Sequence, residues 1–383
     1  MGTVLPYLWI VLHDLRGLNR AKRFFLWLPA VLVLGYSAYL AMQPGFVPED
    51  PMLVDIWFVV MALCAVPQFV YAFWSFMGWL GKRYLHLRRN VGSQVGIVLA
   101  VFALASFLYG FTWGFRKLEV KHLTVFLPEL PEAFDGYRIV QFSDIHLGSY
   151  YGWRSDIPQR DIDSIQAQHA DMICFTGDLQ NAHPLELQKY RKLLSSLRAR
   201  DGVYSILGNH DYSYYVDASP EERLVIERQV QDFERSVGWR LLNNEHEVVK
   251  RGKDSIFVAG TENYDKPKRT SVAKALYGIR PGNFILMLQH IPTQWKKMTP
   301  STINKVYGSK DSVLVAPQLT LSGHTHAGQV EVLGLRPTLF AAYDYGLYER
   351  EGCQLYTTAG LGGVVPIRIG ATAEIVVITL RKR

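Results

Sequence analysis

Long apolar runs dominate the first third of the chain. Three of them, at residues 24–42, 56–80 and 95–115, contain no Asp, Glu, Lys or Arg. A helix needs about 20 mainly apolar residues to cross a bilayer core. A soluble helical bundle would show polar faces at helical spacing, and a secretory signal would have one shorter run with a cleavage site. The pattern therefore predicts about three transmembrane helices within residues 1–122.

The charged residues between these runs indicate how the chain crosses the membrane. A shorter apolar run, residues 4–12, is followed by Asp14, and we expect an interfacial helix there. Four basic residues precede the first long run and four lie between the second and third, whereas the remaining loop carries Glu49 and Asp50 without Lys or Arg. Because cytoplasmic loops favour Lys and Arg, we expect a multi-pass protein of the plasma or inner membrane with an extracytoplasmic C-terminal domain. Three basic residues just after the last run act against this asymmetry.

The hydrophobic pattern changes after residue 122. Short β-rich runs then alternate with amphipathic segments, which predicts an α/β domain over residues 123–383. The expected strands are residues 138–142, 172–176, 203–207, 284–289 and 319–322, and the expected helices are 157–170 and 185–197. Every predicted strand ends at Asp, Asn or His, often just after Gly. In α/β folds the carboxyl ends of strands gather at one crevice, so these side chains should meet there.

The side chains at these strand ends are typical metal ligands. They are Asp144, His146, Asp178, Asn209, His290, His324 and His326. Imidazole and carboxylate together suit Zn, Fe, Mn or Co. Seven ligands are too many for one tetrahedral ion, but they fit two ions that share a bridging carboxylate, as in phosphoryl-transfer sites. Single motifs such as Gly-Asp are weak signals, whereas their joint occurrence at five strand ends is a strong one.

Net charge argues against a nucleic-acid partner. The chain carries +7, but residues 1–122 hold 11 Lys/Arg and 5 Asp/Glu, and the remainder holds 30 and 29. The basicity is therefore concentrated near the apolar runs, and the near-neutral C-terminal domain lacks the positive surface that binds a polyanion. The three cysteines, Cys64, Cys174 and Cys353, form no CxxC pair and are interpreted as small buried apolar residues.

Taken in order, the motifs resemble those of the calcineurin-like metallophosphoesterase superfamily. They are Asp144-Ile145-His146, Gly177-Asp178, Gly208-Asn209-His210-Asp211, His290 and Gly323-His324-Thr325-His326. The tail at residues 359–375 resembles the membrane-anchored bacterial branch of that superfamily. The resemblance covers roughly residues 123–380 and implies a four-layer α/β sandwich, in which two β-sheets are flanked by helices.

The resemblance also implies a role for each motif residue. One divalent metal ion (Mn, Zn or Fe) would be held by Asp144, His146 and His326, a second by Asn209, His290 and His324, and Asp178 would bridge them. A metal-bound hydroxide would be the nucleophile. His210 would protonate the leaving oxygen or stabilise the transition state, and Asp211, or another carboxylate, would orient His210.

These inferences predict a binuclear metal-dependent phosphoesterase that hydrolyses a phosphomonoester, phosphodiester or pyrophosphate bond. The membrane region suggests a membrane- or envelope-associated substrate, either a phosphorylated small molecule or a lipid-linked phosphate. The main alternative is a membrane-tethered metal-binding signalling or scaffold protein without turnover, and a nuclease is a further one. Arg154 and Arg368 are candidates for phosphate binding, with a structural role as the alternative. Substrate, metal identity and oligomeric state stay open.

Overall fold

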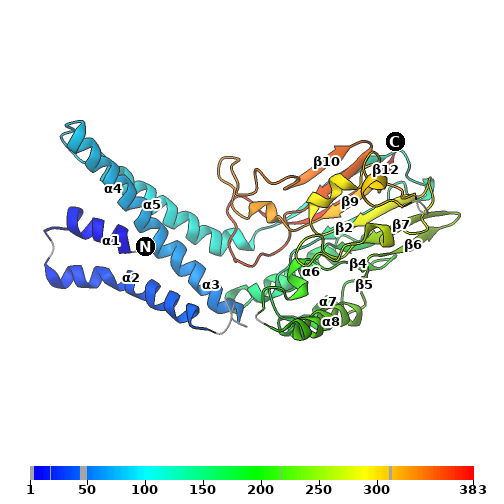
Figure 1. Cartoon of the computed structure of the whole chain (residues 1–383), viewed down its shortest axis with the longest axis horizontal. Coiled ribbons are helices and arrows are strands. Elements are labelled where there is room, and N and C mark those ends of the chain that lie inside the picture. Colours follow the sequence, from blue (N-terminus) through cyan, green and yellow to red (C-terminus); the bar gives the residue numbers. More distant parts are fainter. Residues whose placement is uncertain (1–3, 18, 44–49, 217, 310–312) are drawn as a thin grey trace. The chain divides into compact units, whose positions relative to one another are not determined.

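The computed structural model describes the chain except residues 1–3, 18, 44–49, 217 and 310–312, and it forms two compact units, Met1–Gly114 and Phe115–Arg383 (Figure 1). The first unit is helical. Its helices are α1 (Val4–Trp9), α2 (Arg20–Ala41), α3 (Pro51–Val60), α4 (Val66–Tyr84) and α5 (Val91–Tyr109), with π-helical turns at Ile10–Asp14, Met61–Ala65 and Gly110–Gly114. The turn at Met61–Ala65 joins α3 and α4 into one long helix.

Two helical stretches of this unit are long and apolar enough to cross a bilayer. They are Met52–Tyr84 and Val91–Gly114, whereas Val4–Asp14 and Leu28–Ala41 are shorter apolar helices in the described part of the chain. Helices α4 and α5 approach closely, because a Cβ added at Gly92 would meet the carbonyl oxygen of Trp74 at 2.1 Å. Small residues permit such close packing between apolar helices.

The second unit contains two six-stranded mixed sheets. The first has the order β1 (Leu118–Leu127), β12 (Ala373–Lys382), β2 (Arg138–Phe142), β3 (Met172–Phe175), β4 (Val203–Ser205) and β5 (Arg240–Leu241). The second has the order β10 (Gly346–Arg350), β11 (Cys353–Thr357), β9 (Leu319–Ser322), β8 (Phe284–Leu288), β7 (Asp254–Gly260) and β6 (Glu245–Arg251). Its helices are α6 (Ile157–Gln166), α7 (Arg191–Leu194), α8 (Pro220–Ser236), α9 (Val272–Ala275) and α10 (Ile303–Val306).

The three larger apolar cores of the described residues separate four layers, as the family resemblance implies. The outer face of the first sheet packs on Ile162 of α6 and Phe233 of α8. Neighbouring residues of β8 then point to opposite cores, because side chains alternate along a strand. Leu286 lies in the core between the two sheets, and Met287 lies in the outer core with Val272 of α9.

The five predicted strands are all present as β2, β3, β4, β8 and β9, although three of them end one or two residues early. The predicted helix 157–170 is present as α6, although α6 ends at Gln166, whereas the predicted helix 185–197 is wrong as one element. It divides into 3-10 turns at Pro184–Glu186 and Gln188–Tyr190 and the short helix α7. The pairs β2–β3, β3–β4, β7–β8 and β8–β9 are parallel, so the ends of these strands point to a common edge.

Candidate metal centre

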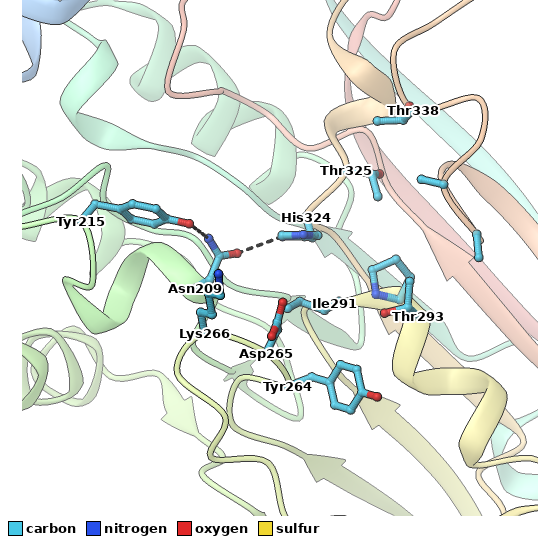
Figure 2. A pocket seen from close by; sticks show the side chains of 13 residues that line it. Asn209, Tyr215, Tyr264, Asp265, Lys266, Ile291, Thr293, His324, Thr325 and Thr338 are labelled. Carbon is cyan, nitrogen blue, oxygen red and sulfur yellow. Dashed lines mark hydrogen bonds between the residues drawn. The ribbon is translucent and has the colours of Figure 1, made fainter. Parts of the chain in front are cut away.

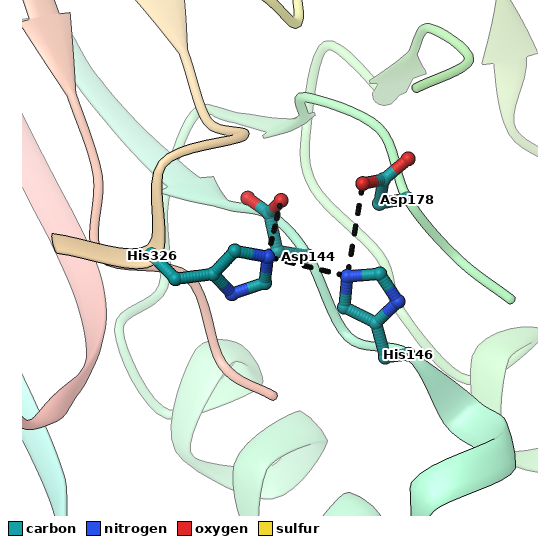
Figure 3. A group of neighbouring side chains, drawn as sticks. All are labelled: Asp144, His146, Asp178 and His326. Atoms are coloured by element: carbon teal, nitrogen blue, oxygen red, sulfur yellow. Dashed lines mark hydrogen bonds and ion pairs between the residues drawn. The ribbon is translucent and has the colours of Figure 1, made fainter. Parts of the chain in front are cut away.

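All seven predicted ligands follow the carboxyl ends of central strands. Asp144 and His146 follow β2, Asp178 follows β3, Asn209 follows β4, His290 follows β8, and His324 and His326 follow β9. The carboxylates and imidazoles form two groups that share Asp178, with the ligand atoms of each group within 4.8 Å of one another. One group is Asp144, His146, Asp178 and His326 (Figure 3), and the other is Asp178, His290 and His324.

The ligand atoms of the first group converge on one point. His146 Nε2 lies 3.3 Å from His326 Nε2 and 3.6 Å from Asp178 Oδ2, and His326 Nε2 lies 3.4 Å from Asp144 Oδ1. In the second group, His290 Nε2 lies 3.1 Å from Asp178 Oδ2. The two groups are therefore joined through one buried carboxylate, since both contacts are to the same oxygen atom, Oδ2 of Asp178.

Backbone strain is concentrated at these ligands. Five of the seven have positive φ: Asp144, His146, Asp178, His324 and His326. Non-glycine residues rarely adopt this left-handed conformation, which costs on the order of 1–3 kcal/mol each and persists where the surrounding structure enforces it. Glycine relieves crowding beside them, since a Cβ added at Gly208 would lie 2.2 Å from Asp178 Oδ1. The left-handed backbone at these strand ends thus turns the ligand side chains inward and costs conformational free energy.

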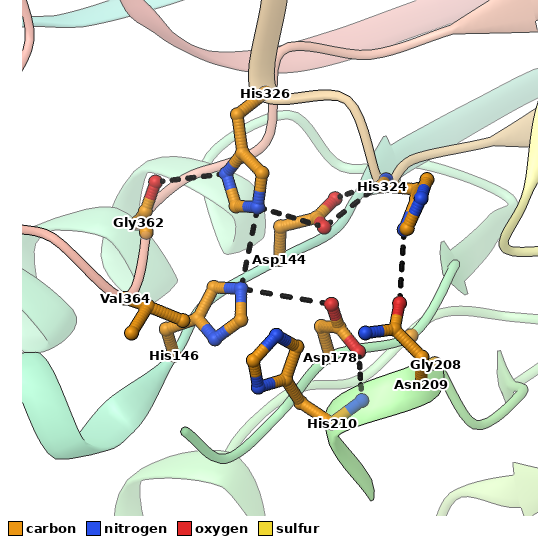
Figure 4. A network of polar contacts seen from close by, with 12 residues as sticks. Asp144, His146, Asp178, Gly208, Asn209, His210, His324, His326, Gly362 and Val364 are labelled. Atoms are coloured by element: carbon orange, nitrogen blue, oxygen red, sulfur yellow. Dashed lines mark hydrogen bonds and ion pairs between the residues drawn. The ribbon is translucent and has the colours of Figure 1, made fainter. Parts of the chain in front are cut away.

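Backbone carbonyl oxygens hold three of the imidazoles through their Nδ1 atoms, on the side of the ring away from the cluster. The Nδ1 atoms of His146, His290 and His326 lie 3.2, 2.7 and 3.3 Å from the carbonyl oxygens of Gln180, Thr176 and Gly362 (Figure 4 shows the contact of His326). A carbonyl only accepts, so each Nδ1 carries a proton and each Nε2 atom faces the cluster. Metal-binding histidines are commonly oriented in this way.

Asn209 supplies an oxygen to the second group. Its Oδ1 atom lies 2.9 Å from His324 Nδ1 and 3.1 Å from His290 Nε2. Its Nδ2 atom donates to the hydroxyl of Tyr215 at 3.0 Å, which sets the direction of the amide. The sequence indicated Asn209, but nothing in it showed that Tyr215 would hold it.

His210 and Asp211 are adjacent in sequence, yet their side chains have separate partners. His210 Nδ1 lies 2.6 Å from the carbonyl oxygen of Asn181, and its ring stacks on that of Tyr215 with centroids 4.5 Å apart. The Asp211 carboxylate instead accepts from backbone amides at Gly208 and at residues 178–180. The expected orientation of His210 by Asp211 is therefore replaced by a backbone carbonyl, and Asp211 ties the β3 and β4 loops together.

Electrostatics keep most of these imidazoles neutral. Burial lowers the pKa of His146 and His326 and brings the pKa of His324 to about 3. Burial also opposes the charge of His290, but the Asp178 carboxylate outweighs it and raises that pKa to about 9. In turn, although burial disfavours its charge, His290 and His210 hold the pKa of Asp178 well below its usual range.

This donor set fits divalent metal ions. In the first group, two neutral imidazoles present lone pairs to each other at 3.3 Å, beside two carboxylates, with both Nδ1 protons turned away. Such a convergence of acceptors is repulsive unless a cation lies among them. In the second group, the proton on His290 balances Asp178, and a cation would replace that proton. Histidine, carboxylate and amide ligands together suit Zn, Mn or Fe.

A cavity of about 440 Å³ opens beside the second group (Figure 2). Asn209, Tyr215 and His324 line it. Thr325 of the last motif also lines the cavity, and residues that the sequence analysis missed form most of the remaining wall: Tyr264, Asp265, Lys266, Ile291, Pro292, Thr293, Thr338, Ala341 and Ala342. The segment with Tyr264 and Lys266 follows β7, a strand that the sequence analysis did not identify, so its position at the same edge could not be anticipated.

The two arginines proposed as phosphate ligands are both buried. Arg154 is 5% exposed, and its guanidinium lies 4.5 Å from the ring centroid of Tyr151. Arg368 is 1% exposed and donates to the carbonyl oxygens of Ala359, Gly360, Gly362 and Ala371. The structural alternative is therefore the correct one for Arg368, which holds the loop that contacts His326.

Comparisons with known proteins agree with this geometry. Residues 137–328 match the family described as "Calcineurin-like phosphoesterase", and residues 3–115 match "Probable Calcineurin-like phosphoesterase, transmembrane domain". A solved structure, the phosphopantetheinyl hydrolase from Mycobacterium tuberculosis, covers 61% of this chain and 96% of its own, with 9% identity and a TM-score of 0.34. That degree of likeness carries no functional argument.

Two relatives are similar to this chain over most of its length. A "Transmembrane protein with metallophosphoesterase domain" from Danio rerio is 30% identical over 299 residues, which cover 75% of this chain and 62% of that protein. An "Uncharacterized metallophosphoesterase" from Helicobacter pylori is 25% identical over 371 residues, covering 93% and 89%. The chain is a membrane protein and belongs to the calcineurin-like phosphoesterase family of metal-dependent phosphoesterases.

Proposed function

We propose that the chain hydrolyses a phosphomonoester, phosphodiester or pyrophosphate bond with two divalent metal ions held by the seven strand-end ligands. The observation that carries this proposal is the convergence of acceptor atoms into two groups that share Asp178. Ions bound there would supply Lewis acidity toward a phosphoryl oxygen and activate water at neutral pH. The remaining work falls to side chains of the protein.

Two residues beside the ligands are placed to act on substrate. His210 has its Nδ1 atom on the carbonyl oxygen of Asn181, which also supports the doubly protonated ring, so Nε2 is the atom that would give a proton to the leaving oxygen. Lys266 in the wall of the cavity offers a positive charge to a phosphate or to a neighbouring anionic group. Asp211 acts indirectly, because its carboxylate fixes the backbone that carries Asp178.

The membrane region has its own part in the proposal. We assign residues 1–122 to a multi-pass anchor with three spans and residues 123–383 to the catalytic domain outside the cytoplasm. Basic residues before the first span and between the last two support this orientation. A substrate in or near the membrane, either a phosphorylated small molecule or a lipid-linked phosphate, follows from that placement.

The test compares the full-length wild-type protein with Asp178→Ala in detergent. Bound metal is measured by mass spectrometry, and hydrolysis of p-nitrophenyl phosphate and bis-p-nitrophenyl phosphate is followed with added Mn, Zn or Fe. We expect about two ions per wild-type chain and loss of both metal and turnover in the variant. Asp232→Ala is the matched control, because this carboxylate on α8 is 79% exposed. A wild-type protein without metal and without turnover would contradict the proposal.

A further inference from the structure

The segment between β9 and β10 exposes an unusual number of large apolar side chains. Leu333 is 97% exposed, Phe340 is 96% exposed and Leu335 is 66% exposed, with Val332 and Leu339 partly exposed beside them. We call residues 332–342 the apolar loop. Concentrated apolar exposure of this kind marks an interaction surface, since isolated exposed residues are common but clusters are not.

The apolar loop is anchored by a defined set of contacts at its base. Val330 forms a bridge with Ile369, and the amide of Glu331 donates to the carbonyl oxygen of Ile369. Within the loop, Val332 and Leu335 exchange backbone hydrogen bonds of 2.9 and 3.0 Å. The backbone therefore holds a tight turn that presents Leu333 outward.

The inner side of the same loop lines the proposed substrate cavity. Thr338, Ala341 and Ala342 face that cavity together with His324 of the second ligand group. Figure 2 labels Thr338 and Thr325 above His324. One short segment thus has an apolar outer surface and, on its other side, a wall of the candidate active site.

The apolar loop lies at the edge of the domain where the chain enters. Strand β1 begins at Leu118, which pairs with Ala373 at the start of β12, four residues after Ile369. Lys121 on β1 lies 3.3 Å from the hydroxyl of Tyr345, just beyond the loop. Residues 115–117 lead from the last apolar helix to β1, and three residues span at most about 10 Å even when fully extended. A bilayer that holds this helix is therefore within reach of that edge.

We propose that the apolar loop inserts into the lipid bilayer and brings the mouth of the cavity to the membrane surface. Leu and Phe side chains at the boundary between headgroups and acyl chains are typical of such interfacial segments. The substrate is then a phosphate ester whose apolar part stays in the bilayer, while its phosphate reaches the ligand groups. This second statement rests on the proposed function, whereas insertion of the loop does not.

Insertion of the apolar loop is tested by fluorescence quenching, which does not depend on catalytic turnover. Full-length Phe340→Cys in a Cys64→Ala background is labelled with bimane and reconstituted into phosphatidylcholine vesicles that contain brominated lipid. The other two cysteines, Cys174 and Cys353, are buried. We expect strong quenching at position 340 and little at the control Tyr277→Cys, a 73% exposed position before β8. Equal quenching at both positions, or none at 340, would overturn the proposal.

Cross-linking distinguishes the bilayer from a second copy of the chain as the partner of the apolar loop. Disulfide-linked dimers through position 340, without quenching by brominated lipid, would assign the apolar loop to a second copy of the chain and reject insertion. Quenching without such dimers supports the bilayer as the occupant.

The substrate statement is tested with methyl and hexadecyl p-nitrophenyl phosphate, the latter embedded in phosphatidylcholine vesicles. Replacing Leu333→Ser and Phe340→Ser together should raise the KM for the hexadecyl ester roughly tenfold and leave hydrolysis of the methyl ester unchanged. Equal KM values in wild type and variant would reject the substrate statement. If the wild-type protein hydrolyses neither of these diesters nor p-nitrophenyl phosphate, the proposed function fails, and the quenching result still decides insertion.

Discussion

At the scale of single residues, neighbours in sequence have different tasks at the metal centre. His210 contacts Asn181 and Tyr215, whereas Asp211 binds backbone amides of the β3 and β4 loops. Because these contacts are separate, replacing His210 and replacing Asp211 should have different effects on the protein. His210 should affect the chemical step, and Asp211 should affect the integrity of the site.

Replacing His210→Ala should therefore lower kcat by about 10²–10⁴, the usual contribution of a general acid. Bound metal should stay at the wild-type level, because the His210 ring lies in neither ligand group. Metal analysis and steady-state hydrolysis of bis-p-nitrophenyl phosphate measure the two effects in the same preparation. Loss of metal in this variant would show that His210 is a ligand instead.

Replacing Tyr215→Phe tests how the amide of Asn209 is oriented. The variant keeps the ring on His210 but removes the hydroxyl that accepts from Asn209 Nδ2. Without this bond the amide is free to turn its nitrogen toward the imidazoles, and affinity for one of the two proposed ions should fall about 10–100-fold. Metal titration by calorimetry measures this, with Tyr214→Phe, 45% exposed, as the control. Two unchanged affinities would reject the role.

Glu234 on α8 predicts a pH dependence of stability. Burial, together with the nearby charge of Asp211, raises its pKa well above the ordinary value of 4.5. The folded state therefore keeps a proton that the unfolded state releases above pH 4.5, so this residue makes stability fall as pH rises. Glu234→Gln needs no proton, and its unfolding midpoint should vary less between about pH 5 and pH 8 than that of wild type. An unchanged slope in thermal unfolding would contradict this.

At the scale of elements, the sequence predicts best where one local signal repeats. The five strands that end in ligands were identified because short β-rich runs stop at Asp, Asn or His. The helix predicted at residues 185–197 is not formed as one element, because tertiary contacts override the helical hydrophobic pattern of this segment. The Glu186 carboxylate accepts from three backbone amides, at residues 181–183, and the Tyr190 hydroxyl donates to the carbonyl oxygen of Tyr150.

Other parts of the site had no local signal at all. The support of His210 comes from a backbone carbonyl, which any residue at Asn181 would supply. The cavity residues Tyr264 and Lys266 follow a strand that pairs parallel with β8 across a long connection. Such long-range pairing is invisible in a single sequence, because strand propensity depends on the neighbours that a strand meets.

The loop after β11 is the element for which a structural prediction is sharpest. Arg368 Nη2 lies 2.8, 3.1 and 2.7 Å from the carbonyl oxygens of Ala359, Gly360 and Gly362, and the last of these also contacts His326. Lysine keeps the charge but not the planar fork of donors. Arg368→Lys should therefore lower the free energy of unfolding by about 1–3 kcal/mol and weaken metal retention.

Thermal unfolding and metal release to a chelator measure these two effects of Arg368→Lys. The matched control is Arg350→Lys, because that side chain is 49% exposed and pairs with Glu351. Wild-type stability in Arg368→Lys would mean that the loop is held by its backbone contacts alone, such as the 2.8 Å bond from the amide of Gly362 to the carbonyl oxygen of Asp144.

At the scale of the whole molecule, the orientation of the catalytic domain depends on how many times the first unit crosses the bilayer. Four basic residues, two in the last turn of α4 and two after it, flank the connection between the stretches Met52–Tyr84 and Val91–Gly114, and we therefore expect that connection in the cytoplasm. In a bacterial inner membrane, alkaline phosphatase fused after Arg383 should then be active, because this enzyme needs oxidising conditions. Green fluorescent protein fused at the same position should not fluoresce. Fusions after Arg89 should give the reverse. Fluorescence at the C-terminus would instead mean an even number of crossings, with the short helix Val4–Asp14 as the added one.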